Sequence, residues 1–447
     1  MNLKIKTALV SVSDKENILS LLKILKKYKI NILSSGGTYT AIKKLGYSCT
    51  ELSKYTGFKE MLDGRVKTLH PKIHAGILHD RQNRGHKNEM SSRKFPSIDL
   101  IVVNFYPFQK VVRSSKNSKD IIENIDIGGP TLVRSAAKNF KNVTILTNKK
   151  DYPNLIKELE KNEGKTSLKF RELMSSKAFG LTAYYDAMIS DWFNKKINVH
   201  FPERKIIFGR KLNELRYGEN PHQKASVYIS DFKDKEIDLD LISGKKLSYN
   251  NYNDIFSSIE ILNSFKKLPT TVVVKHSNPC GISSNLSKLK SFTNAFNCDP
   301  LSAFGGVVAC NFKMNIYIAR EINKRFIEVI MAKGFDKKSL NLLKKKKNLR
   351  IIDTSNFTDE SKLNFTSKNN SILIQNVDNK NFSKKDFKVV SKRKPSNETL
   401  NKLIFAFNVC RSVKSNAIVI TDNYKTIGIG SGQPSRLDSC QIAINKM

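Results

Sequence analysis

The chain has 447 residues, of which 39% are hydrophobic, and a formal net charge of +38. This length predicts two or three domains, and no apolar run in the sequence approaches the roughly 18 residues of a membrane-spanning helix. The six cysteines include no Cys-x-x-Cys pair, which argues against a zinc site or a disulfide framework and favours a reducing, cytoplasmic setting. The first residues enter an apolar strand without a signal-peptide pattern, so we expect no membrane partner.

The positive charge permits two interpretations. A basic surface attracts nucleic acid or small polyanions. However, most of the excess is Lys, which is spread along the whole chain together with abundant Asn and Ile, as in AT-rich coding sequence. Single-strand nucleic-acid binding combines clustered cations with interleaved aromatic residues, whereas the cations here are dispersed. We therefore expect no nucleic-acid partner.

The first 150 residues alternate short apolar runs with helical patterns, which predicts an α/β unit with a parallel sheet. The predicted strands are residues 6–12, 30–33, 100–104 and 143–146. Ser13 and Glu16 have the Ser-x-x-Glu spacing of a helix capping box. A long amphipathic stretch from about 167 to 193 predicts the helix that closes this unit.

A polar passage at residues 194–204 predicts the junction with a second α/β unit. The predicted strands of that unit are residues 271–274, 305–309 and 417–421. Residues 336–398 are poor in apolar side chains, so we expect loops with isolated strands such as 372–374. A helical stripe of apolar residues from 400 to 410 comes just before the strand at 417.

A glycine pair lies at the second strand-to-helix junction, in the run Ser35-Gly36-Gly37-Thr38. Glycines let a phosphate approach the backbone, and the free N–H groups and dipole of a helix start favour an anion. Lys15, at the start of another helix, could add a point charge. The alternative is an ordinary glycine turn with a threonine cap.

Residues 63–71 pack two cations, a threonine and a histidine around a glycine turn. This density is typical of a pocket for an anion or a carbonyl group, and the alternative is a solvated loop. His70 and His74 have i,i+4 spacing, but Pro71 lies between them and no acidic ligand is near in sequence. We therefore expect no metal site there.

Three further polar residues follow elements of the first sheet. Tyr106 comes after the strand at 100–104, and Asp126 precedes a glycine turn and the helix that carries Lys138. A phenol, a carboxylate and an ammonium group in these positions suit a pocket at the carboxyl ends of parallel strands.

In the second unit, Lys275 and His276 directly follow the apolar run 271–274. This arrangement holds a proton acceptor and an electrostatic stabiliser rigidly at a pocket mouth. The alternative is two solvated residues that cap a strand. In the polar turn at 215–223, Arg216 could grip a phosphate or a carboxylate. The glycine pattern at 428–433 resembles a nucleotide loop, although such a pattern alone is weak evidence.

Ten stretches between residues 11 and 436 carry a closer resemblance. They are SVSDK, SSGGT, DGRVKTLHPKIHAGIL, NFYPF, NIDIGGPTLVRSAAKN, LRYGENPHQ, VVVKHSNPCG, DPLSAFGG, VKSNAIV and GIGSGQPSR. In this order they resemble the PurH family of bifunctional purine-biosynthesis proteins. That family combines IMP cyclohydrolase with phosphoribosylaminoimidazolecarboxamide (AICAR) formyltransferase.

The resemblance implies two α/β domains. Residues 1–198 would form a methylglyoxal-synthase-like, Rossmann-like parallel-sheet domain with the cyclohydrolase activity. Residues 199–447 would form a cytidine-deaminase-like formyltransferase domain that lacks zinc. Cys280 is not followed by x-x-Cys and no His-x-Glu precedes it, so the zinc-activated water of true deaminases is not expected.

The resemblance also assigns residues to the first pocket. Those that would bind the nucleotide phosphate are Ser13, Lys15, Ser35, Gly36, Gly37 and Thr38. Those that would line the base and formyl group are Arg65, Lys67, Thr68, Asn104, Tyr106, Asp126 and Ile127. Lys138 matches the family's cyclohydrolase lysine and would exchange protons, assisted by Asp126 and Tyr106. Ring closure joins groups of one molecule, so it requires orientation and proton transfer but no tightly bound cofactor.

For formyl transfer, the resemblance implies that His276 takes a proton from the 5-amino group of AICAR. Lys275 would stabilise the oxyanion formed from 10-formyltetrahydrofolate, the formyl donor. The residues that would hold the nucleotide are Arg216, Tyr217, Gly305, Asn416 and Arg436. The family also implies a homodimer.

Family members continue beyond the position that matches Met447, the last residue here. We therefore expect either a fragment or a shortened gene product. The alternative function is cyclohydrolase activity alone, with a degenerate second domain.

Overall fold

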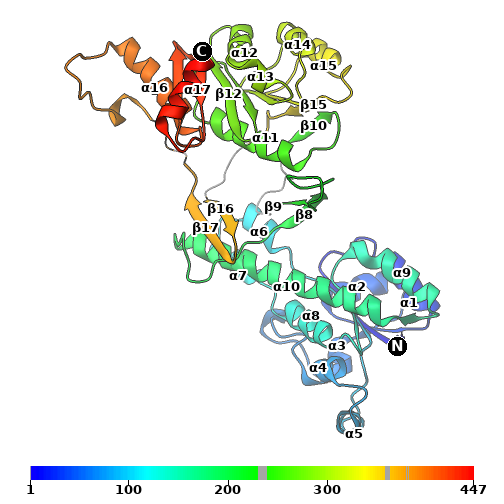
Figure 1. Cartoon of the computed structure of the whole chain (residues 1–447). Helices are drawn as coiled ribbons and strands as arrows, with labels where there is room; N and C mark the ends of the chain where they lie inside the picture. The colour runs from blue at the N-terminus through cyan, green and yellow to red at the C-terminus, as the bar shows by residue number, and fades with distance from the viewer. Residues whose placement is uncertain (1, 230–238, 358–362, 379, 381) are drawn as a thin grey trace. The chain divides into compact units, whose positions relative to one another are not determined.

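The computed structural model describes residues 2–229, 239–357, 363–378, 380 and 382–447 (Figure 1). The chain divides into two compact units, one of residues 1–210 with 230–234 and one of 211–229 with 235–447. The predicted boundary between residues 198 and 199 follows the end of α10 (Leu168–Lys196) and stays a prediction. No helix in the described ranges is both long and apolar enough to cross a membrane.

A five-stranded sheet forms the core of the first unit. Its strands, in spatial order, are β4 (Thr50–Glu51), β3 (Asn31–Ser34), β2 (Thr7–Val12), β5 (Leu100–Asn104) and β6 (Thr144–Leu146). Every neighbouring pair is parallel, which confirms the predicted parallel sheet. The central strands are buried on both faces, as parallel sheets require.

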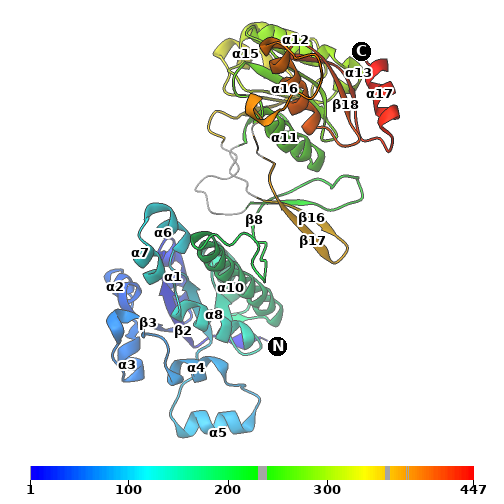
Figure 2. The same cartoon turned by 90° about the vertical axis from the view of Figure 1, so that its left-hand side faces the viewer.

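The first unit also contains helices. They are α1 (Ile18–Lys27), α2 (Gly36–Lys44), α3 (Leu52–Thr56), α4 (Pro71–Leu78), α5 (Arg84–Ser92), α6 (Phe108–Ser114), α7 (Ser118–Glu123), α8 (Gly128–Lys138), α9 (Tyr152–Lys161) and α10. Helix α8 packs on β5 and β6, and α10 runs beside α8 (Figures 1 and 2). The predicted closing helix is therefore confirmed. A small antiparallel pair, β1 (Leu3–Lys4) with β7 (Lys165–Thr166), completes the unit.

The predicted capping box at Ser13 is wrong. The residue before α1 is Asn17, which has φ +61° and makes no side-chain cap. The Ser13 hydroxyl instead donates to Asn104 Oδ1 at 2.9 Å, and Glu16 forms an ion pair with Lys149. A tertiary contact to the end of β5 thus replaces the local cap that the spacing suggests.

A mixed eight-stranded sheet forms the core of the second unit. Its strands, in spatial order, are β10 (Asp240–Ser243), β15 (Arg350–Asp353), β14 (Val329–Ala332), β13 (Val307–Cys310), β11 (Thr270–Lys275), β12 (Asn278–Ser284), β19 (Lys425–Gly430) and β18 (Ile418–Asp422). Strands β13, β14 and β15 run parallel to one another, whereas β11 is antiparallel to both β12 and β13.

Helices lie on both faces of this sheet. The helices of the unit are α11 (Tyr249–Leu262), α12 (Lys288–Asn297), α13 (Pro300–Ala303), α14 (Ile316–Asn323), α15 (Lys337–Leu343), α16 (Asn397–Arg411) and α17 (Arg436–Asn445). Val273 faces the core that α12 and α14 close, whereas its neighbours Val272 and Val274 face the α11 side. This alternation gives three layers and sets α11 directly against β11.

Two hairpins stand outside the sheet: β8 (Arg210–Glu214) with β9 (Ser226–Ile229), and β16 (Leu363–Lys368) with β17 (Ser371–Asn376). The expected strand at 372–374 lies in β17 and is confirmed. The expectation of loops elsewhere in 336–398 is partly wrong, because α15 and the buried strand β15 lie there. Residues 358–362, 379 and 381 fall outside the described residues.

Candidate active site

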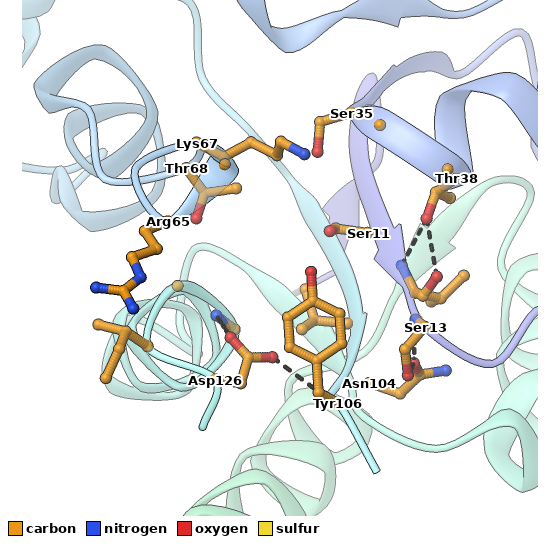
Figure 3. Close-up of a pocket in the computed structure, with 18 of the residues that line it drawn as sticks. Ser11, Ser13, Ser35, Thr38, Arg65, Lys67, Thr68, Asn104, Tyr106 and Asp126 are labelled. Carbon is orange, nitrogen blue, oxygen red and sulfur yellow. Dashed lines mark hydrogen bonds between the residues drawn. The ribbon is translucent and has the colours of Figure 1, made fainter. Parts of the chain in front are cut away.

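A pocket of about 720 Å³ lies in the first unit, where the parallel strands β2 and β5 end. The start of α2, the loop at residues 63–68 and the turn that begins α8 complete its wall (Figure 3). Binding sites of open α/β sheets are expected at this edge, outside the carboxyl ends of the strands. The pocket is lined by all of the residues assigned to it from the sequence except Lys138.

Two lysines flank the N-terminus of α2. A Cβ atom placed on Gly36 would lie 2.9 Å from Lys67 Nζ, and one on Gly37 would lie 3.8 Å from Lys15 Nζ. Gly36 also has φ +49°, which a side chain would strain. Two ammonium groups beside the free N–H groups of a helix start make this end of the pocket an anion site.

Thr38 of α2 forms hydrogen bonds with the end of β2. Its hydroxyl donates to the carbonyl oxygen of Val12 at 2.9 Å and accepts from the Val12 N–H at 3.0 Å. The side chain is 5% exposed and lies inside α2, whose N-cap is Ser35. The alternative prediction from the sequence, that Thr38 is the N-cap of α2, is therefore wrong. Thr38 instead joins α2 to the end of β2.

Asn104 joins the ends of β2 and β5. Its Oδ1 accepts the N–H groups of Ser13 at 2.6 Å and Asp14 at 3.1 Å, and its Nδ2 donates to the Asp14 carbonyl at 2.9 Å. These bonds fix the loop that carries Lys15, so Ser13 and Asn104 shape the anion site through the backbone.

Asp126 and Tyr106 form the opposite side of the pocket. The Asp126 carboxylate accepts the N–H of Gly129 at 2.8 Å and that of Tyr106 at 3.4 Å. Burial raises the pKa of Asp126, while these two N–H groups oppose the rise. The Tyr106 side chain is 52% exposed, and its hydroxyl points into the pocket (Figure 3). A partly buried carboxylate beside a phenol can exchange protons with a bound ligand.

The loop at residues 63–68 contacts the rest of the rim. Arg65 pairs with Glu123 of α7 through two contacts, one of them between Nε and Oε1 at 3.0 Å. Lys67 pairs with Glu60 at 2.8 Å. Thr68 Oγ1 lies 2.5 Å from the position of a Cβ on Gly128, so this glycine permits the approach of the loop to α8. No signal in the sequence indicated Glu123, which comes from a separate helix.

Lys138 lies away from the pocket. It is the exposed last residue of α8, whereas the pocket is formed by the first residues of that helix. Ten residues of α-helix span about 15 Å. Lys138 therefore cannot contact Asp126 of the same chain.

In the second unit, Lys275 and His276 lie where β11 turns into β12. Lys275 pairs with Asn278, which leaves His276 and Ser277 as a two-residue hairpin turn. Both have positive φ, +53° and +59°. Lys275 Nζ donates to the carbonyl of Phe304 at 2.7 Å, which brings it to the turn containing Gly305.

Asp254, which no sequence pattern indicated, contacts the same turn. This aspartate of α11 is 8% exposed, and its Oδ1 accepts the N–H of Ser277 at 2.7 Å. Burial raises the pKa of Asp254, whereas hydrogen bonds from the turn oppose that effect. In the sequence, Asp254 precedes apolar Ile255 in a helical pattern and looks like an ordinary residue of the polar helix face. The pattern therefore does not predict its contact with the turn.

The glycine pattern at 428–433 has a packing role. Gly428 and Gly430 belong to β19, and a Cβ on either would overlap a carbonyl oxygen of α17, from Ala443 or Ser439. Close packing thus accounts for Gly428 and Gly430, and the interpretation as a nucleotide loop stays a prediction for residues 431–433.

The assigned residues near the C-terminus lie around this packing contact. Asn416 Nδ2 donates to the carbonyls of Gln433 at 3.1 Å and Pro434 at 2.7 Å. Arg436 is the exposed first residue of α17. The Asn416 bonds thus set the path of the segment that leads to Arg436.

Arg216 and Tyr217 lie in the turn between β8 and β9. This turn is tied to α11 by Asn250 Nδ2, which donates to the carbonyl of Glu219 at 3.3 Å. In the part of the chain that the structure describes, no hydrogen bond joins Arg216 or Tyr217 to the turn at His276.

Comparisons with known proteins identify the family of the chain. The family described as AICARFT/IMPCHase bienzyme matches residues 136–446, and the MGS-like domain matches residues 17–131. A bifunctional purine biosynthesis protein PurH from Rhizobium johnstonii is 41% identical over 448 residues, 99% of this chain and 83% of the relative. A protein of the same name from Leptospira biflexa is 42% identical over 446 residues, 99% of this chain and 86% of the relative.

A solved structure, that of ForH, is 31% identical and covers 42% of this chain and 97% of its own, with a TM-score of 0.39. At this TM-score, the match supports no conclusion about the fold. The family match covers most of the chain, and the two relatives align over nearly all of it. The chain therefore belongs to the AICARFT/IMPCHase bienzyme family, the family of the bifunctional purine biosynthesis proteins PurH.

Proposed function

We propose that the protein catalyses the last two steps of IMP biosynthesis. It transfers a formyl group from 10-formyltetrahydrofolate to AICAR and then closes the ring of formyl-AICAR to give IMP. The observation that carries ring closure is the first pocket, where two lysines at a helix start lie in one cavity with a partly buried carboxylate. A nucleotide needs the first feature for its phosphate, and ring closure needs the second for proton transfer.

In ring closure, the carboxamide nitrogen attacks the formyl carbon and a C–N bond forms. The C–O bond of the resulting carbinolamine then breaks, and the oxygen leaves as water with one proton from the carboxamide nitrogen and one from the formamido nitrogen as a C=N bond forms. Asp126 accepts the proton that the carboxamide nitrogen loses. The Tyr106 hydroxyl donates a hydrogen bond to the formyl oxygen as negative charge develops on it. Both reacting groups belong to one bound molecule, so the pocket contributes mainly by orienting them.

In formyl transfer, the 5-amino group of AICAR attacks the formyl carbon of 10-formyltetrahydrofolate. His276 takes the proton from this amine, Lys275 stabilises the oxyanion, and tetrahydrofolate leaves with a proton on its nitrogen. Folate is a cosubstrate in this scheme, and no tightly bound cofactor is required. Arg216, Tyr217 and Gly305 hold the nucleotide.

We also propose a homodimer in which Lys138 acts on the pocket of the other copy. The proposal is supported by the position of Lys138 at the far end of α8 from its own pocket. Mixing Lys138→Ala with Asp126→Asn chains tests it, because a mixed dimer has one intact site. Statistical mixing of symmetric dimers then restores up to about a quarter of wild-type cyclisation. Mixtures proven to contain mixed dimers but without recovered activity would contradict this role.

Each of the two reactions is assigned to one domain. Residues 1–198 act as the cyclohydrolase and residues 199–447 as the formyltransferase, and the enzyme works on small molecules in the cytoplasm. Asp126→Asn tests the separation. It is expected to lose conversion of supplied formyl-AICAR to IMP while formyl-AICAR still forms from AICAR and the folate donor. Loss of neither activity would refute the role of the first pocket.

A further inference from the structure

The turn that presents His276 has an unusual backbone for its sequence. His276 and Ser277 both have left-handed φ values, +53° and +59°. Two-residue hairpin turns with two such residues are normally built from Asn-Gly or similar pairs, because a side chain disfavours this conformation. Strained residues of this kind persist only where the surroundings hold them, and they gather at functional sites.

A buried carboxylate supplies that hold. Asp254 Oδ1 accepts the N–H of Ser277, the second residue of the turn, at 2.7 Å. Asp254 is 8% exposed, and the next residue, Ile255, is 0% exposed within the core between α11 and the sheet. The anchor therefore belongs to a packed helix and not to a mobile loop.

The same helix also contacts the turn of Arg216. Asn250 and Asp254 are one helical turn apart, so their side chains lie on one face of α11. Asn250 binds the carbonyl of Glu219 and Asp254 binds the turn of His276. One rigid helix thus contacts the two segments assigned to formyl transfer.

We propose that Asp254 is a positioning residue for formyl transfer: by accepting the N–H of Ser277, it holds the turn in the conformation that directs the imidazole of His276. This inference rests on the proposed role of His276. Asp254 acts through the backbone of the turn and does not touch the reacting atoms.

The test compares Asp254→Ala and Asp254→Asn with wild type in the full-length chain. We expect kcat for formyl transfer to fall at least about 30-fold in the alanine variant, equivalent to about 2 kcal/mol. The asparagine variant, which keeps one acceptor oxygen, should lose less. KM for AICAR should stay within about threefold, because the nucleotide contacts remain.

Asp336→Ala is the matched control. Asp336 is another aspartate of the second unit, and its Oδ1 accepts the N–H of Ser339 at 2.6 Å at the start of α15. It follows the C-terminal end of β14, whereas the His276 turn lies at the opposite edge of the sheet, since β11 is antiparallel to β13. We expect this variant to lose stability while its formyl-transfer kcat stays close to that of wild type.

A second change separates positioning from general stability. Ser277→Gly removes the side-chain penalty at one left-handed position. Added to Asp254→Ala, it should recover kcat at least about fivefold, since glycine adopts the turn without an anchor. Hydrogen exchange of the peptide containing residues 276–278 should accelerate in Asp254→Ala relative to wild type and Asp336→Ala.

Wild-type kcat in a folded Asp254→Ala protein, or unchanged exchange with no rescue by glycine, would overturn the proposal. If Asp254→Ala does not fold, the smaller loss expected in Asp254→Asn decides the outcome. A wild-type chain that transfers no formyl group would instead refute the proposed function. The exchange measurement would then still show whether Asp254 holds the turn.

Discussion

The substitution Gly129→Ala displaces the Asp126 carboxylate without removing it. A Cβ atom on Gly129 would lie 2.5 Å from Asp126 Oδ2 and 3.0 Å from both Cγ and Oδ1. Ordinary contacts of this kind begin near 3.4 Å. The carboxylate must therefore move by roughly 1 Å, a displacement that costs catalysis heavily where groups are pre-aligned.

The magnitude follows from the bond that this movement breaks. Asp126 Oδ1 accepts the Gly129 N–H at 2.8 Å, and a hydrogen bond to a charged group contributes about 1.5–3 kcal/mol. At 1.36 kcal/mol per decade, kcat for ring closure should fall about ten- to 100-fold. Alanine is favoured over glycine in a helix by up to about 1 kcal/mol. Since the broken bond also stabilises the fold, this gain offsets only part of the loss, and the free energy of unfolding should fall by up to about 2 kcal/mol.

The assay follows conversion of purified formyl-AICAR to IMP, together with thermal unfolding of the same sample. Gly180→Ala is the matched control, because Gly180 lies within α10 and a Cβ there meets nothing within 4 Å. It should keep wild-type turnover and gain slight stability. Equal turnover in Gly129→Ala and Gly180→Ala would refute the role of the Asp126 carboxylate in ring closure.

Three further predictions concern the anion site, the pKa of Asp126 and the packing of the second unit. Lys15→Met and Lys67→Met should each weaken IMP binding about tenfold or more, because each removes a charged partner of the phosphate. Calorimetry measures the affinity, with Lys23→Met, a change at an exposed lysine of α1, as control. Equal affinities in all three variants would contradict the prediction. Burial raises the pKa of Asp126, and a base must be ionised. The cyclisation rate should therefore be maximal above this raised pKa and fall as the pH drops through it. The fall should begin at a higher pH than for an ordinary aspartate, whose pKa is about 3.9. A profile of kcat against pH without this acidic fall would argue against Asp126 as the base. Gly430→Ala should destabilise the second unit by about 1–3 kcal/mol, because a Cβ there overlaps the backbone of α17; an unchanged urea midpoint would show that the helix can move away.

Elements with strong periodicity were predictable from the sequence. The strand at 100–104 is observed with these bounds, and the long helix predicted from about 167 to 193 is α10. Buried parallel strands read as continuous apolar runs, and a long helix repeats its pattern many times. Local polar signals were less reliable, because the Ser13 hydroxyl binds a distant residue, Asn104, in place of the helix start.

The candidate sites were predictable where function rests on residue type and order. Lys15 and Lys67 lie beside Gly36 and Gly37, although neither lysine is close to both glycines in sequence. Asp254 could not be predicted, since its role depends on the fold bringing α11 under the turn of His276. A single carboxylate in a helix carries no pattern that separates a buried anchor from a solvated residue.

Paired assays of wild type and His276→Ala test the proposed function most directly. One reaction contains AICAR and 10-formyltetrahydrofolate, and the other contains formyl-AICAR alone. We expect wild type to form IMP in both reactions, and His276→Ala to form IMP only from formyl-AICAR. Loss of both conversions in a folded His276→Ala protein would contradict separate sites, and a wild-type chain inactive in both reactions would contradict the function itself.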